Sequence, residues 1–382
     1  MLTRSVAVAR IFGVEIRVHV TWLAVLAFVV VAVTLQPDAF PAGFPDLGRV
    51  LVGAIVGFLF FASVVIHELG HALAAGSRGL PAGPVLIVVF GGITAVDEDA
   101  RTPQDEFVIA LAGPIVSIAV GVPLILAALA IGIGDSVLGL FTGVVGAVNV
   151  MLGALNLVPA FPLDGGRVLH AVIWQMTGDT TRAIRLSARI GRMLGSLIVG
   201  IGLLVSVAGD GWTGVVILVS GWFVIQGSRV TERRQAIEEL LAGVQVEQVM
   251  ERDLPELAPT LTVDTFAEQL LGDDERTSVP VVEGGSLVGV IGVGQLRRVG
   301  RRRWPELRAA DIMVAPPILP SIGAEEGAWA GLELLRRSGL DGIPVMAGPD
   351  LLGLLTRRSI VATIQTRAAE RARTADRART GA

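Results

Sequence analysis

The 382-residue sequence contains no cysteine, no tyrosine and no lysine. The absence of cysteine excludes disulfide bonds, thiolate metal ligands and cysteine nucleophiles. The absence of tyrosine removes one common acid and oxyanion donor. Neither sign of charge is in large excess, because the sequence has 31 basic residues, all of them arginine, and 35 acidic residues. The net charge of -4 gives the whole chain no attraction to nucleic acid, so we expect no nucleic-acid partner.

Charged residues of any kind are scarce in the first part of the sequence. The chain is 52% hydrophobic and 17% charged, with a mean hydropathy of +0.67, which is typical of a membrane protein. Residues 1–228 hold only 11 of the 31 arginines. The sequence therefore predicts a membrane domain over 1–228, a linker over 229–243 and a more polar C-terminal part. The dominance of Ala, Gly, Val and Arg indicates a GC-rich bacterial genome.

Six apolar stretches are long enough for a spanning helix, which needs about 20 residues. They are residues 18–35, 50–76, 107–133, 137–158, 188–208 and 212–228. An even number of spans places both termini on one side of the membrane. The N-terminal segment lacks a convincing small-x-small cleavage site, so we expect it to be retained as a first helix rather than removed as a signal peptide. The loops of that side contain Arg4, Arg10, Arg17, Arg78, Arg101, Arg167, Arg182, Arg185, Arg229 and Arg233, whereas the other side has only Arg49. The positive-inside rule predicts that both termini and the C-terminal half are cytoplasmic.

The C-terminal part repeats itself once. Residues 279–281 recur as 343–345, and residues 287–291 recur as 351–355. Each copy has the order helix, strand, glycine-containing turn, strand, helix, which predicts a small sheet covered by helices. The copies cover 244–300 and 307–366. Residues 367–382, rich in Arg and Ala, are predicted to be a frayed helix or a disordered tail.

A metal-binding motif lies in the second apolar stretch. His67 and His71 are four residues apart, so both imidazoles share one helix face and can bind one zinc ion. Glu68 is next to His67 and can act as general base on a zinc-activated water. Ionisable residues inside a membrane helix are costly and normally mark a functional site. The alternative, two histidines satisfied by neighbouring helices, gives Glu68 no role.

Asp164 is the candidate third ligand. It follows the fourth apolar stretch, where Pro159 and Pro162 stop the helix and two glycines permit close backbone approach. Three protein ligands would leave one zinc position open for water. The alternative role of Asp164 is to cap the short helix predicted at 165–176.

These motifs resemble the site-two protease family of intramembrane metalloproteases, in the bacterial branch with C-terminal tandem CBS domains. The resemblance covers nearly the whole chain, as a polytopic α-helical membrane protein of about six transmembrane helices with an α/β tandem CBS module. It implies one Zn²⁺ per chain, bound by His67, His71 and Asp164. It also implies that Glu68 is the base that activates water. Further matches are His19, Gly91-Gly92 and Ala112-Gly113-Pro114.

The implied activity is hydrolysis of a peptide bond in a membrane-anchored protein substrate, without a covalent intermediate and under control of the CBS pair. This regulated intramembrane proteolysis would release a regulator such as an anti-sigma factor fragment. A homo-oligomer formed through the CBS domains is left open. Two alternatives are a CBS-gated membrane transporter or channel, and a catalytically dead scaffold; the convergence of charged residues on one metal motif and the intact Glu68 argue against them.

Substrate contacts are predicted at two places. Residues 84–96 are too short to span, have Gly91-Gly92 at their centre and are predicted to form an interfacial hairpin. Its edge could pair with an extended substrate, although a plain surface hairpin is an equal alternative. Asn156 and Asn149 are oxyanion candidates. For Asn149, a hydrogen bond between membrane helices is an equal alternative.

The CBS repeats lack one nucleotide-binding feature. CBS relatives often bind ribose through an Asp three residues after a Ser or Thr. The corresponding pairs here are Gly292 with Gln295 and Thr356 with Ser359, so both carboxylates are absent. We therefore predict that the CBS pair does not bind adenine nucleotides in the usual way. The arginines of the CBS pair could still bind another small-molecule ligand that is more anionic.

Overall fold

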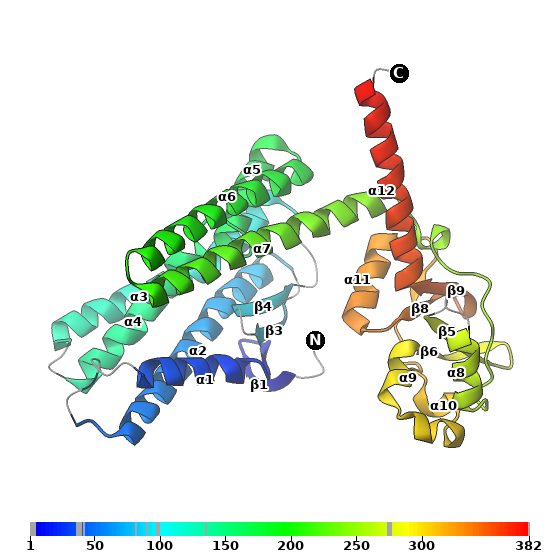
Figure 1. Cartoon of the computed structure of the whole chain (residues 1–382), viewed down its shortest axis with the longest axis horizontal. Coiled ribbons are helices and arrows are strands. Elements are labelled where there is room, and N and C mark those ends of the chain that lie inside the picture. Colours follow the sequence, from blue (N-terminus) through cyan, green and yellow to red (C-terminus); the bar gives the residue numbers. More distant parts are fainter. Residues whose placement is uncertain are drawn as a thin grey trace. The chain divides into compact units, whose positions relative to one another are not determined.

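The computed structural model describes residues 5–35, 40, 43–80, 82–88, 91–96, 100–133, 136–272 and 277–380. The chain divides into two compact units, Met1–Arg233 and Arg234–Ala382. The first unit is mainly helical, and the second combines helices with small sheets (Figure 1). The predicted class, a polytopic helical protein with a C-terminal α/β module, is confirmed.

A four-stranded sheet stands beside the helices of the first unit. It consists of β1 (Ser5–Ile11), β2 (Val14–His19), β3 (Ala82–Val88) and β4 (Gly91–Val96), in the order β1-β2-β3-β4. Phe12 and Gly13 both have positive φ, as a tight hairpin turn between β1 and β2 requires. β2 and β3 are parallel neighbours, and β3 pairs antiparallel with β4. The hairpin predicted at 84–96 is therefore present, and β4 is an edge strand.

Five helices in the described part of the chain are long and apolar enough to cross a membrane. They are α2 (Asp46–Ser77), α3 (Pro103–Ile131), α4 (Val137–Asn156), α6 (Thr180–Val207) and α7 (Gly211–Leu241). The first of the six predicted spans needs correction. Residues 18 and 19 belong to β2, and α1 (Trp22–Thr34) has 13 residues. At 1.5 Å per residue α1 is about 20 Å long, shorter than the roughly 30 Å hydrocarbon layer.

The helices of the first unit run as antiparallel pairs. β2 leads into α1 and β3 follows α2, and because both strands belong to one sheet, α1 and α2 lead away from that sheet and return to it. Short connections make α3 antiparallel to α4 and α6 antiparallel to α7, and within each pair the two helices lie side by side (Figure 1). The C-terminal ends of α2 and α4 therefore lie at the same side of the helical unit as the sheet.

The second unit contains two copies of one motif. In the first copy α8 (Val263–Gly272) precedes β5 (Ser278–Glu283), β6 (Ser286–Gly292) and α9 (Val293–Arg298). In the second, α11 (Ala328–Ser338) precedes β8 (Gly342–Ala347), β9 (Asp350–Thr356) and α12 (Arg357–Thr380), with β7 (Ile322–Gly323) beside β8. The strand pairs have equivalent registers, since Pro280 faces Val290 and Pro344 faces Leu354. The predicted internal repeat is thus visible in the pairing.

The two copies also exchange backbone contacts. Glu251, before the first copy's helix, bridges Leu354 on β9, and Val314, before the second copy's helix, bridges Val290 on β6. Residues 367–380, predicted as part of a frayed or disordered tail, continue α12, and the predicted linker lies largely in α7, which extends to Leu241.

Candidate metal centre

Two helices bring the predicted metal ligands together. His67 and His71 lie on α2, are 3% and 5% exposed, and face α5 (Asp164–Thr177), whose first residue is Asp164. The His67 Nε2 atom lies 3.0 Å from Asp164 Oδ2, and His71 Nε2 lies 3.2 Å from the same oxygen. The two Nε2 atoms are 3.3 Å apart. Residues 97 positions apart in sequence thus present three donor atoms to one point.

The spacing of these atoms fits a zinc ion. Zinc–nitrogen and zinc–oxygen bonds are about 2.0–2.2 Å long, and two ligands of a tetrahedral ion are then about 3.3–3.5 Å apart. The three observed separations lie at or slightly below this range. One nitrogen or oxygen per residue leaves one corner of the tetrahedron for a further ligand. The donor set and its geometry therefore suit a catalytic rather than a closed structural zinc site.

Helix α3 fixes the orientation of both imidazoles. His71 Nδ1 donates a hydrogen bond to the carbonyl oxygen of Ile109 at 2.7 Å, and this bond requires the proton on Nδ1. In neutral His71 the Nε2 atom then carries the lone pair through which an imidazole binds a metal ion. His67 Nδ1 lies 2.9 Å from the hydroxyl of Ser117, which is fully buried. Such outer partners hold a metal-binding imidazole in the required tautomer and direction.

Two glycines make room for these rings. A Cβ atom at Gly113 of α3 would overlap the imidazole of His71, coming within 2.6 Å of Cε1. At Gly70 of α2 it would come within 3.1 Å of the Ala112 carbonyl oxygen. The helices α2 and α3 therefore approach closely at the level of the histidines. Gly113 of the Ala112-Gly113-Pro114 motif is therefore required, because any side chain there would overlap the imidazole of His71.

The start of α5 is set by close backbone packing. A Cβ atom at Gly166 would lie 2.6 Å from the Phe161 nitrogen, and one at Gly165 would overlap the carbonyl of Val158. The loop before Asp164 is held in turn by α7, where Ser228 donates a hydrogen bond to the Phe161 carbonyl oxygen. Burial raises the pKa of Asp164, but the interactions with His67 and His71 lower it by more, so its pKa lies below the ordinary value. An ionised carboxylate is the form that binds a cation.

Glu68, the predicted base, is also buried, at 8% exposure. It follows His67 on α2, so its side chain is rotated by about 100° from that of His67. Its carboxylate interacts electrostatically with His71. A second acid is thus placed beside the histidine cluster without being one of the three converging donors.

The two asparagine candidates have different surroundings. Asn149 is 1% exposed, and its Nδ2 donates to the Ser63 hydroxyl at 2.8 Å and to the Val145 carbonyl at 2.9 Å. Both amide protons are engaged, which favours the interhelical role. Asn156 is partly exposed, and its Nδ2 donates within α4 to the Leu152 carbonyl. One amide proton of Asn156 has no partner among the described residues.

The remaining candidates lie in or next to the sheet. The backbones of Gly91 and Gly92 pair with Val88 and Ile87, at the turn-proximal end of the β3–β4 hairpin. His19 ends β2 and accepts a hydrogen bond from the Thr21 backbone nitrogen, just before α1. His19 is therefore separate from the cluster of His67, His71 and Asp164.

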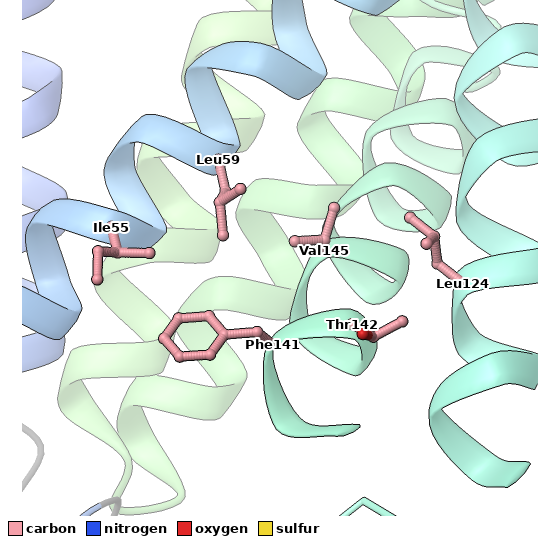
Figure 2. Close-up of a pocket in the computed structure, with 6 residues that line it drawn as sticks. All are labelled: Ile55, Leu59, Leu124, Phe141, Thr142 and Val145. Atoms are coloured by element: carbon pink, nitrogen blue, oxygen red, sulfur yellow. The ribbon is translucent and has the colours of Figure 1, made fainter. Parts of the chain in front are cut away.

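An apolar hollow of about 340 Å³ lies two turns along α2 from His67, between α2, α3 and α4 (Figure 2). It is lined by Ile55, Leu59, Leu124, Phe141, Thr142 and Val145. The Thr142 hydroxyl donates to the Leu138 carbonyl within α4, so it offers no donor to the hollow. The Ser63–Asn149 hydrogen bond lies one helical turn further toward His67. The hollow presents mainly hydrocarbon and is not part of the metal centre.

Several residues that support the metal centre carry no functional motif in the sequence. Ser117 and the Ile109 carbonyl, which orient the imidazoles, have no motif of their own. Glu106 and His170 form a buried pair between α3 and α5, with 2.7 Å between Oε2 and Nδ1. The position of His170 on the amphipathic helix predicted at 165–176 favours a structural role over a functional one, but it does not indicate Glu106 as the partner.

Comparisons with known proteins point to the same chemistry. The model described as Peptidase family M50 matches residues 55–133 and 132–198, and the CBS domain model matches residues 246–301. Rip3 of Mycobacterium tuberculosis is 32% identical over 95% of this chain and 91% of its own length. The protein sll0528 of Synechocystis sp. is 29% identical over 96% and 97%, respectively. Both carry names that assign them to the zinc metalloproteases.

A solved structure is also similar to this chain. The structure titled Site-2 Protease from Methanocaldococcus jannaschii is 27% identical and covers 60% of this chain and 95% of that one, with a TM-score of 0.44. The similarity to Rip3, by contrast, extends over nearly the full length of both chains. The chain belongs to peptidase family M50, the site-2 proteases, and is a zinc metalloprotease with several membrane helices and a CBS domain.

Proposed function

We propose that this chain is an intramembrane zinc endopeptidase in which His67, His71 and Asp164 bind one zinc ion. The observation that carries the proposal is the convergence of these three donor atoms, 3.0 to 3.3 Å apart, on buried helices. The metal, when bound, supplies a Lewis acid that polarises the scissile carbonyl and makes an attacking water acidic near neutral pH.

The residues of the chain then divide the remaining work. Glu68 accepts the proton of the attacking water and returns it to the leaving amine. Asn156 donates its uncommitted amide proton to the developing oxyanion. His71 and His67 keep their ligand orientation because Ile109 and Ser117 hold their Nδ1 atoms.

The depth of the site supports a substrate class. α2 ends at Ser77, six residues beyond His71, so that histidine lies about 9 Å along the helix from its end. The arginine distribution supports a cytoplasmic location for this end of α2, and therefore cleavage near the cytoplasmic end of a membrane-anchored protein. We assign a bacterial plasma membrane as the location, and an anti-sigma factor is a substrate of suitable kind.

A helical substrate must become extended before its amide is accessible. The edge strand β4 is suited to this, because one side of its backbone is paired with β3 and the other side can accept an added strand. Gly91 and Gly92 would let the substrate backbone approach closely.

We infer a regulatory role for the CBS pair. CBS domains bind small-molecule ligands such as AMP. In this chain, however, the Thr356 hydroxyl already donates to the Glu251 carboxylate at 2.5 Å, and the Gly294 amide donates to Asp341 at 2.7 Å. These groups, at the end of β9 and in the first turn of α9, are therefore engaged by the chain's own carboxylates. This supports a ligand other than an ordinary adenine nucleotide.

Two variants test the catalytic proposal. Glu68→Gln keeps the ligand set, so we expect about one zinc per chain and no proteolysis of a membrane-anchored substrate. His71→Ala removes a ligand, so zinc and proteolysis should both be lost. An active Glu68→Gln protein, or an active wild-type protein without stoichiometric zinc, would disprove the mechanism.

A further inference from the structure

The contact between α3 and α5 decides whether the metal ligands meet. Helix α3 holds the imidazoles through Ile109 and Ser117, whereas α5 carries Asp164. A metal–ligand distance tolerates about 0.2 Å of displacement. The position of α5 along α3 must therefore be fixed more tightly than apolar packing, which is non-directional, would fix it.

The described residues provide a buried polar contact between these helices. Glu106, in the first turn of α3, is 9% exposed, and His170, in the middle of α5, is 5% exposed. Glu106 Oε2 accepts a hydrogen bond from His170 Nδ1 at 2.7 Å, the length of a charge-assisted bond. The side chain of Arg167 lies farther from the same carboxylate, at 3.9 Å, and is 40% exposed.

The placement of this pair links the two halves of the metal centre. Glu106 is three residues before Ile109, so both are on one face of α3. His170 is six residues after Asp164, about 9 Å along α5. A closed path therefore runs from His71 to Ile109, along α3 to Glu106, across to His170, and along α5 to Asp164.

The remaining polar atom of His170 makes the pair unusual. His170 Nε2 is buried and has no hydrogen-bond partner among the described residues. A buried polar atom without a hydrogen-bond partner destabilises the folded protein. A histidine used only to fill space would incur this cost for nothing, since an apolar side chain would pack as well. The directional bond from Nδ1 is what an apolar residue could not supply.

We propose that His170, held by Glu106, is a positioning residue that sets Asp164 at ligand distance from His67 and His71. This inference rests on the proposed zinc ligands. It predicts that the pair controls metal affinity and coordination geometry, without touching substrate or metal.

Four variants of the full-length protein isolate this role. His170→Leu removes the bond and leaves Glu106 without this partner. Glu106→Leu/His170→Leu removes both polar groups while keeping an apolar contact, a change that is often neutral for stability. His170→Asn keeps an N–H near the position of Nδ1. Gln175→Ala is the control, because it removes the exposed hydrogen bond from Gln104 to Gln175, 2.6 Å long, between the same two helices.

The readouts are the zinc dissociation constant from chelator competition, the absorption spectrum of the cobalt-substituted protein, and kcat and KM. We expect both leucine variants to bind zinc on the order of 10–100-fold more weakly, with an altered cobalt spectrum and lower kcat at unchanged KM. His170→Asn should recover most of the affinity, and Gln175→Ala should match the wild type. If His170→Leu does not fold, the double variant carries the same test.

Three results would overturn the inference: wild-type affinity and spectrum in the double leucine variant, no recovery in His170→Asn, or an equal loss in Gln175→Ala. These differ from failure of the proposed function. If wild-type protein binds no zinc, or if His71→Ala keeps it, the ligand assignment is wrong. If wild type binds one zinc and the pair variants bind it equally well, only the role of His170 is wrong.

Discussion

Replacing Gly113 by alanine tests the metal centre with a single methyl group. A Cβ atom there would lie 2.6 Å from Cε1 and 2.8 Å from Cδ2 of His71. Carbon atoms in contact are normally about 3.5–4.0 Å apart, so the imidazole must retreat by about 1 Å or the helices α2 and α3 must separate. Such a displacement is about five times what a metal–ligand bond tolerates. We expect Gly113→Ala to lose zinc and proteolysis, with an overpacking cost of about 1–3 kcal/mol in stability.

Substitutions of two other glycines are controls that distinguish loss of the metal from a general loss of stability. In Gly121→Ala the added carbon would lie 2.7 Å from the Gly146 carbonyl oxygen, so the same helix is overpacked against α4 and away from His71. In Gly200→Ala it would meet nothing within 4 Å.

The assay is zinc per folded chain by elemental mass spectrometry after dialysis against a chelator, together with Tm. Gly121→Ala should lower Tm but retain zinc in the folded protein, and Gly200→Ala should retain both. A Gly113→Ala protein with wild-type zinc content and activity would refute the steric argument.

Three further predictions concern other parts of the chain. Asn149→Ala should lower stability by about 1–3 kcal/mol, because it removes both hydrogen bonds of the Asn149 amide group. Asn156→Ala should keep Tm and lower kcat about 10²- to 10³-fold, and the opposite pattern would exchange the two roles. A reporter fused after residue 230 should score as cytoplasmic, and an external score would overturn the orientation. Calorimetric titration of the full-length protein with ATP, ADP and AMP should show no micromolar binding, because a lost carboxylate costs about 1.5–3 kcal/mol; a micromolar Kd would contradict this.

The convergence of His67, His71 and Asp164 could be predicted because each segment carries a local pattern of its own. Two histidines four residues apart define one helix face, and Asp164 follows a proline-rich helix stop. The repeat in the C-terminal unit could be predicted for a similar reason, since the two similar sequences form strand pairs with equivalent registers. These features depend on neighbouring residues, which a sequence displays directly.

The supporting groups could not be predicted because they depend on distant contacts. The Ile109 carbonyl is a backbone atom, and nothing in residue identity marks it as the acceptor for His71. The pairing of β2 with β3 joins segments on either side of two helices. The sequence predicts a membrane span from residue 18, because Val18 and Val20 continue an apolar run, whereas residues 18 and 19 belong to β2. Strand and helix compete for such residues, and backbone pairing in the sheet decides the outcome here.

The parallel pairing of β2 with β3 has a consequence for how the protein is made. Ile16 pairs with Val85, although both α1 and α2 lie between them in the chain. At about 5–20 residues per second of synthesis, β3 follows β2 after roughly 3 to 14 s, and α1 and α2 must be in place before the strands can meet. Until then the β1–β2 hairpin has an unpaired edge. Since an isolated two-stranded hairpin is only marginally stable, β3 and β4 also need β1 and β2. The β1–β2 hairpin thus acts as the template on which β3 and β4 assemble. The edge strand β4, proposed to present substrate to the histidine cluster, therefore depends on a hairpin that is distant from His67 and His71 in the sequence.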